Sequence, residues 1–178
     1  QVLDLPFLFD GWDHVFAFTQ TPIYQEFLTE SDKIGIKTLA VITRGARSVT
    51  NSGDPVESVE DLKGMKLRVI ESKVFVDTFN ALGAAPQAMS WGEVFTALQQ
   101  GTIDGHENSI ATILNERVYE VQENVTLTEH IFAFFSVHAS SKLWNSLSDE
   151  DKVLFDDLAS EIVAEVNEGQ RQLEADYI

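Results

Sequence analysis

The stretch Ser90–Asn108, SWGEVFTALQQGTIDGHEN, carries the clearest structural signals in the chain. Ser90 and Glu93 have the capping-box spacing that begins a helix. An apolar stripe of helical period follows, and Gly101 comes next as a residue that can take the left-handed conformation ending a helix. The sequence therefore predicts a helix from Ser90 that ends at Gly101.

Polar residues close this stretch. Thr102–Ile103 is a brief strand-prone run, and Asp104–Gly105 predicts a turn toward His106, Glu107 and Asn108. Ligands of α/β proteins usually bind at the ends of strands. The last three residues are therefore a candidate site.

Composition narrows the function classes. The 178 residues are long enough for one domain or two small ones, and no apolar run approaches the length of a transmembrane helix. Cysteine is absent, which excludes disulfides, thiolate metal sites and thiol nucleophiles. The formal charge of −17 makes nucleic acid a poor partner, because phosphate binding needs a basic face.

Charge is unevenly distributed along the chain. Between Lys33 and Lys73, eight basic residues face five acidic ones, for a net charge of +3. From Ser148 onward, ten acidic residues face two basic ones, for a net charge of −8. A positive segment in an acidic chain is typical of a small-anion site, although scatter among exposed side chains gives the same pattern.

The remaining patterns predict an α/β fold of βαβα order with a parallel sheet. The sequence predicts one strand at 36–42 and a second at 49–52, with an interruption at 44–47. Two further strands are expected at 125–127 and 131–137. Ser148 and Asp151 cap the longest helix, which carries an apolar stripe with steps of three or four residues.

Several long motifs resemble those of the TRAP-transporter solute-binding proteins, the DctP-like periplasmic subunits of tripartite ATP-independent transporters. The resemblance lies in LPFLF (5–9), DLKGMKLRV (61–69), EVFTALQQG (93–101), IDGHEN (103–108), YEVQ (119–122) and TEH (128–130). These motifs cover essentially the whole chain in the family's order.

The resemblance implies a periplasmic-binding-protein-like α/β fold with two lobes, a hinge and a long C-terminal helix. Residues 1–44 are expected in the first lobe and 45–130 in the second. Residues 131–178 are expected to return to the first lobe and to form the hinge-spanning helix. The family's first βαβ units and signal peptide are not in the sequence, so we expect an internal fragment.

The resemblance also assigns two arginines to the ligand. Arg68 matches the family's carboxylate-binding arginine, and a guanidinium can hold a carboxylate with two parallel hydrogen bonds. Arg47 matches a second ligand-contacting arginine of some branches. The alternative for Arg68 is a surface strand arginine paired with Glu71 or Asp61. The alternative for Arg47 is an exposed loop arginine.

Other candidate ligand contacts follow from the same motifs. Asn108 matches the family's ligand amide, with a turn or cap residue as its alternative. Trp91 would form an aromatic wall over the carbon chain of the ligand, unless it is a core residue. Glu107 is expected to hold an arginine or a water, and His106 to stay exposed. Glu71 either points away from the anion or selects a ligand with hydroxyl or amine groups.

We therefore expect a non-catalytic, periplasmic solute-binding protein for a small organic acid, with C4-dicarboxylates first and sugar acids, sialic acid or other monocarboxylates next. The expected partners are the ligand and the TRAP membrane subunits, with no cofactor and no metal. The full-length family implies a monomer, and dimerisation of this fragment through exposed core faces is the other option. A non-binding partial domain and an enzyme using His106 and Glu107 are the competing classes. The motifs of metalloproteases, α/β-hydrolases and nucleotide-binding proteins are absent from the sequence.

Overall fold

The computed structural model describes residues 2–177 and divides into two compact units. Unit 1 contains 1–8 and 46–133, and unit 2 contains 9–45 and 134–178. The residues before Phe9 group with unit 1, where the Phe7 amide donates to the His130 carbonyl oxygen at 2.8 Å. The resemblance predicts that 1–44 lie in one lobe, so the grouping differs at this end. The correspondence between units and lobes stays a prediction.

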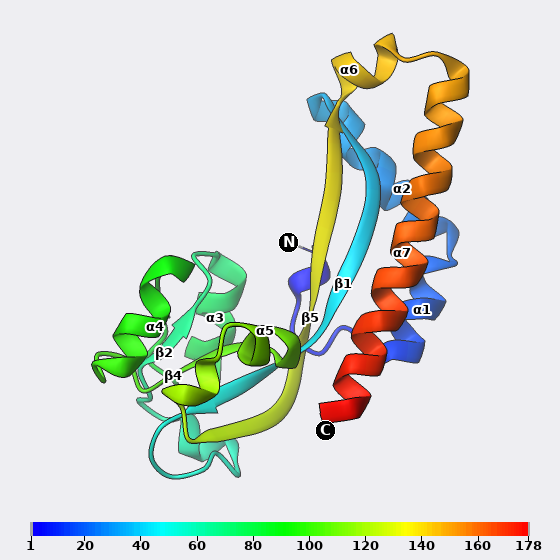
Figure 1. Cartoon of the computed structure of the whole chain (residues 1–178). Coiled ribbons are helices and arrows are strands. Elements are labelled where there is room, and N and C mark those ends of the chain that lie inside the picture. Colours follow the sequence, from blue (N-terminus) through cyan, green and yellow to red (C-terminus); the bar gives the residue numbers. More distant parts are fainter. Residues whose placement is uncertain (1, 178) are drawn as a thin grey trace. The chain divides into compact units, whose positions relative to one another are not determined.

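The protein has the mixed α/β architecture that the sequence predicts (Figure 1). Its single described sheet has the strand order β3-β2-β4-β1-β5. The strands are β1 (Ile36–Asn51), β2 (Leu67–Val69), β3 (Gln87–Ala88), β4 (Gly105–Ser109) and β5 (Asn124–Ser140). The helices of unit 1 are α3 (Lys73–Ala81), α4 (Trp91–Gln99) and α5 (Ile110–Asn115), with 3-10 turns η1 (Val2–Asp4), η3 (Val59–Leu62) and η4 (Val118–Glu120).

Two predicted strand breaks are wrong. β1 runs without interruption through 44–47, and β5 joins the two segments predicted at 125–127 and 131–137. Gly45, at φ 86°, lets β1 pass close to helix α7 (Asp149–Tyr177), because a Cβ at that position would lie 1.7 Å from the Glu174 carboxylate. Arginine and glycine weaken the strand pattern in the sequence, whereas neighbouring strands and helices supply the partners that maintain it.

The expected all-parallel sheet is also corrected. β2 runs parallel to β3 and to β4, but β1 is antiparallel to β4, with Val49 opposite Glu107 and Thr50 opposite His106. Moreover, β4 begins at Gly105 and contains the polar tripeptide, whereas Thr102–Ile103 lies outside it. The candidate residues are therefore inside a strand.

Two apolar clusters cover unit 1. One packs Phe75 and Phe79 of α3 against strand residues Val49, Leu67 and Val69. The other joins α4 and α5 through Val94, Leu98, Ile103, Ile110, Ile113 and Val118. Gly101 ends the α4 segment at φ 65°, as predicted. The first cluster packs α3 against β1 and β2, and the second packs α4 against α5.

Unit 2 contains α1 (Trp12–Thr19), α2 (Pro22–Glu30), η2 (Ser31–Ile34), α6 (Ser141–Ser146) and α7 (Asp149–Tyr177). As predicted, Ser148 accepts a hydrogen bond from the Asp151 amide at the start of α7. The apolar stripe of α7 is largely exposed at Phe155, Leu158 and Ile162. None of the helices in residues 2–177 has the length and apolar content needed to span a bilayer.

Candidate functional site

The candidate site is built around β4, whose five residues, GHENS, are all buried. Side chains of a strand alternate between the two faces of its sheet. The pairing places Glu107 on the same face as Val49 and Arg47, and His106 on the same face as Thr50 and Arg68. The structure thus separates the predicted residues into two groups.

On the first face, Arg47 and Glu107 form a buried ion pair. The Arg47 Nε donates to Glu107 Oε2, and Nη2 donates to Oε1 at 2.9 Å and to the Glu107 carbonyl oxygen at 2.8 Å. The Arg47 guanidinium also lies over the Phe75 ring, 5.3 Å from its centroid. Arg47 is therefore neither an exposed loop residue nor open to a ligand here, and Glu107 holds an arginine as expected.

His130 completes this group. Its Nε2 lies 3.3 Å from Glu107 Oε2, and its Nδ1 lies 2.8 Å from the Thr128 hydroxyl. Burial alone would raise the pKa of Glu107, but the charge of Arg47 and the hydrogen bonds from His130 and Arg47 outweigh it, so that the pKa is lowered. Glu107 is consequently ionised at neutral pH. Sequence reasoning did not connect His130 with Glu107, because no spacing links residues on β4 and β5.

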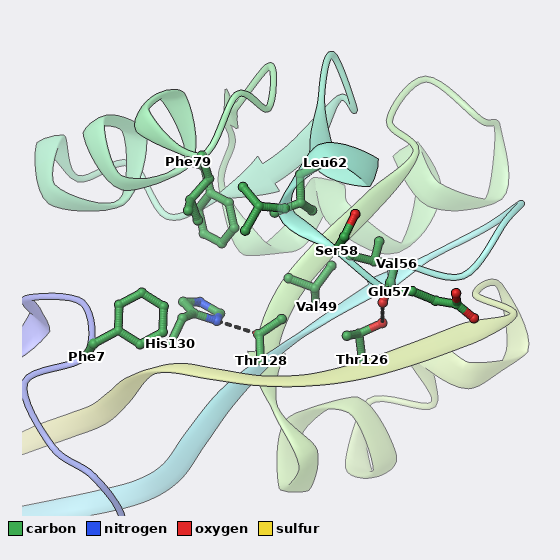
Figure 2. A pocket seen from close by; sticks show the side chains of 12 residues that line it. Phe7, Val49, Val56, Glu57, Ser58, Leu62, Phe79, Thr126, Thr128 and His130 are labelled. Carbon is green, nitrogen blue, oxygen red and sulfur yellow. Dashed lines mark hydrogen bonds between the residues drawn. The ribbon is translucent and has the colours of Figure 1, made fainter.

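A small apolar pocket of about 240 Å³ adjoins the first face. Figure 2 shows His130 and Phe7 on one side of it, with Val49, Leu62 and Phe79 nearby. Its lining is mainly aliphatic and aromatic, with hydroxyl groups from Ser58, Thr126 and Thr128. None of the predicted ligand-binding residues lines it.

The second face has a different character. Arg68 is 4% exposed, and its Nε and Nη2 both donate to the Met89 carbonyl oxygen, at 2.9 and 2.6 Å. A guanidinium has five N–H donors, and the hydrogen bonds found among residues 2–177 use two of those of Arg68, which leaves three. No Arg68 nitrogen is among the fully buried side-chain atoms that lack a hydrogen-bond partner in residues 2–177. These three donors are therefore available to an acceptor from outside the described chain.

The pKa shift of Arg68 is consistent with a buried guanidinium that has no carboxylate partner in the described residues. Burial lowers the pKa of its guanidinium, and the charge of Glu107 partly opposes that effect. No carboxylate contacts Arg68 within the described residues. The predicted alternative, an ion pair with Glu71 or Asp61, does not form. Asp61 instead accepts hydrogen bonds from Ser58, and Glu71 is exposed just after β2.

Trp91, at the first turn of α4, joins the second face. Its ring lies 5.6 Å from the Arg68 guanidinium carbon and 6.0 Å from the His106 ring. Trp91 is 39% exposed, so it is not a core residue. Asn108 is two residues from His106 on the same face of β4, is buried, and accepts a hydrogen bond from the Ser109 amide at 3.0 Å.

The expectation that His106 stays exposed is wrong, because its side chain is fully buried. His106 Nδ1 lies 2.6 Å from the Thr50 hydroxyl, and burial lowers the pKa of His106 to about 4. His106 and Glu107 also lie on opposite faces, which does not favour their acting together on one substrate. Among residues 2–177, no cluster of three His, Asp or Glu side chains could hold a metal ion.

Comparisons with known proteins agree with the fold. Residues 1–178 match the family model DctP, described as bacterial extracellular solute-binding protein, family 7. A solute-binding protein of Verminephrobacter eiseniae is 38% identical over 159 residues, which make up 89% of this chain and 48% of that protein. The chain thus spans about half the length of the curated relatives it matches.

Solved structures give the same result. A TRAP periplasmic solute-binding protein from Polaromonas sp. JS666 bound to D-erythronate matches with a TM-score of 0.92 and 35% identity, over 98% of this chain and 57% of that one. A second, from Shewanella oneidensis with bound succinate, has a TM-score of 0.86 and 33% identity, over 99% of this chain and 60% of that one. Relatives of one architecture therefore hold acids of different chemistry.

Proposed function

The chain belongs to the DctP family of bacterial extracellular solute-binding proteins, family 7, and we propose that it binds a small organic acid through Arg68. The observation that carries the proposal is the buried guanidinium with three N–H donors that no described residue accepts. A carboxylate supplies acceptors in the geometry of that fork. It would also offset the desolvation that lowers the pKa of Arg68.

The other parts of the proposed site have separate roles. Trp91 provides an apolar surface beside the guanidinium for the carbon chain of the acid, and Asn108 provides an amide on the same sheet face. Arg47 and Glu107 support β4 from the opposite face through their ion pair. The charge of Glu71 raises the pKa of Arg68 slightly against the larger lowering effect of burial, and a ligand with hydroxyl or amine groups would tolerate this carboxylate.

Among organic acids, C4-dicarboxylates come first, because the HENSIATI and YEVQ segments resemble the dicarboxylate and sialic-acid branches. Sugar acids are the second candidate, supported by the D-erythronate-bound relative. The whole protein would act in the periplasm and deliver its ligand to TRAP membrane subunits. In this role the protein would bind and release its ligand without catalysis.

A thermal-shift screen against organic acids tests the proposal. We expect the unfolding temperature to rise with the concentration of a bound acid. The matched control is Lys66→Ala, which removes a cation from the same segment, two residues before Arg68. Arg68→Ala should abolish the shift, and Lys66→Ala should retain it. A folded chain that responds to no acid would contradict the proposal, and conversion of an acid to a product would indicate an enzyme.

A further inference from the structure

His106 has a buried ring nitrogen without a partner. Its side chain is fully buried, and its Nε2 has no hydrogen-bond partner within residues 2–177. Such an orphan is uncommon, because leaving a buried polar atom unsatisfied costs about 1–3 kcal/mol. Neither the Arg68 hydrogen bonds nor the ion pair of the opposite face accounts for it.

The surrounding hydrogen bonds determine which ring nitrogen carries the proton. The Gln122 amide nitrogen donates to the Val121 carbonyl oxygen at 3.0 Å and to the Ser52 hydroxyl at 2.9 Å, so Gln122 Oε1 is an acceptor. Thr50 donates its only hydroxyl proton to that oxygen at 2.8 Å. The Thr50 oxygen must therefore accept from His106 Nδ1 at 2.6 Å.

His106 is consequently a neutral imidazole with its proton on Nδ1. Burial lowers its pKa to about 4, which agrees with a neutral ring at pH 7. In this tautomer Nε2 carries a lone pair and can only accept a hydrogen bond. The missing partner is a donor.

Covalent geometry indicates the direction of the lone pair. Nδ1 points across the sheet toward Thr50 on β1, which is one neighbour of β4. Nε2 lies at the far end of the ring, on the side of the other neighbour, β2, where Arg68 is directly opposite His106. The Trp91 ring contacts both residues. The acceptor is thus directed to the side of β2, the strand that carries Arg68.

We propose that His106 is a specificity-determining residue of the Arg68 site, and that its Nε2 accepts a hydrogen bond from a hydroxyl group of the bound acid. The inference rests on the proposed function, because Arg68 must hold the carboxylate. Trp91, whose ring centroid lies 6.0 Å from that of His106, is the exposed member of this cluster. A site with a buried acceptor disfavours an analogue that lacks the hydroxyl, because the acceptor then stays unpaired. The preferred ligand class is hydroxylated carboxylic acids.

Calorimetric titration of the chain with two pairs of acids tests this inference: malate against succinate, and D-erythronate against butyrate. The wild-type chain should bind the hydroxylated acid of at least one pair about tenfold more tightly, the effect of one buried hydrogen bond. His106→Asn keeps a donor near the Nδ1 position and removes the acceptor, so the ratio of affinities should fall to about one. His106→Gln keeps an acceptor near the Nε2 position and should retain the preference.

His14→Asn is the matched control, because it makes the same change at a partly exposed histidine of unit 2 and should leave the ratio unchanged. Thermal unfolding of each variant verifies that it is folded. Equal affinities for both acids in the wild type, or an unchanged ratio in folded His106→Asn, would overturn the inference while leaving acid binding intact. No binding of any acid would overturn the proposed function and this inference together.

Discussion

The two faces of β4 differ in how a buried arginine is paired. On one face, the Arg47 guanidinium meets the Glu107 carboxylate, and His130 adds a further contact to that carboxylate. On the other face, Arg68 is equally buried but donates only to a carbonyl oxygen, next to a histidine nitrogen without a partner. A satisfied network stabilises a fold, whereas unsatisfied groups on rigid strands are available to a ligand. The difference distinguishes an arginine paired within the chain, Arg47, from Arg68, which we propose binds the acid.

The largest expected effect concerns the satisfied face. Glu107→Gln leaves the Arg47 guanidinium buried without a counter-charge, and breaking a buried pair in this way costs about 3–5 kcal/mol. Urea denaturation would measure the change in the free energy of unfolding. Asp77→Asn, which breaks the exposed pair with Lys73, should cost less than about 1 kcal/mol. Equal costs for the two variants would mean that the faces do not differ.

A pH titration of stability probes the second face. In the unfolded chain His106 titrates near 6.5, whereas in the folded chain its pKa is lowered to about 4. Below pH 6.5 the unfolded state takes up a proton that the folded state does not, so the stability present at neutral pH falls until about pH 4. The loss should be about 3 kcal/mol.

Urea denaturation between pH 7 and pH 4 would measure this loss, and His106→Asn should remove it. His14→Asn serves as the control and should follow the wild type. If the free energy of unfolding of His106→Asn depended on pH as that of the wild type does, the His106 ring would not be held neutral by the fold.

Replacement of Arg68 should weaken ligand binding directly, because Arg68 is the proposed carboxylate contact and Arg47 is paired with Glu107. Arg68→Lys keeps the positive charge and removes the planar fork, so we expect affinity for the best acid of the screen to fall by about 10- to 100-fold, because charge-assisted hydrogen bonds contribute about 1.5–3 kcal/mol each. Calorimetric titration gives the affinity, and thermal unfolding separates it from a change in stability. If folded Arg68→Lys bound the acid with undiminished affinity, Arg68 would not hold the carboxylate through two parallel hydrogen bonds.

The smallest effect should come from Trp91. Trp91→Leu keeps an apolar side chain and removes the aromatic ring beside Arg68, a contact that contributes about 0.5–1 kcal/mol at an exposed site. Stability should fall by about that amount. Phe95→Leu, also partly exposed on α4, controls for the loss of aromatic area. A cost above 3 kcal/mol would show that Trp91 is a core residue after all.

Motifs and helix signals predicted much of this molecule. The Gly101 helix end, the cap of α7 and the mixed α/β class follow from local chemistry, and the family follows from motifs such as DLKGMKLRV. The same motifs contain the candidate residues Arg68, Glu107 and Asn108, and Trp91 lies just before EVFTALQQG. The sequence pattern did not predict strand β4. Its segment GHENS lacks the alternation of apolar and polar residues that marks a strand, although all five residues are buried. Burial of a polar strand depends on partners that lie far away in the sequence.

The sequence by itself determined the family, the positions of the helices and the residue types available for a carboxylate. Only the tertiary structure decided which residue meets which. The antiparallel register of β1 and β4 placed Glu107 against Arg47, and the parallel register of β2 and β4 placed His106 opposite Arg68. The physical reason is that a strand presents alternate side chains to opposite faces, so adjacent residues such as His106 and Glu107 take different partners and pKa shifts of different cause.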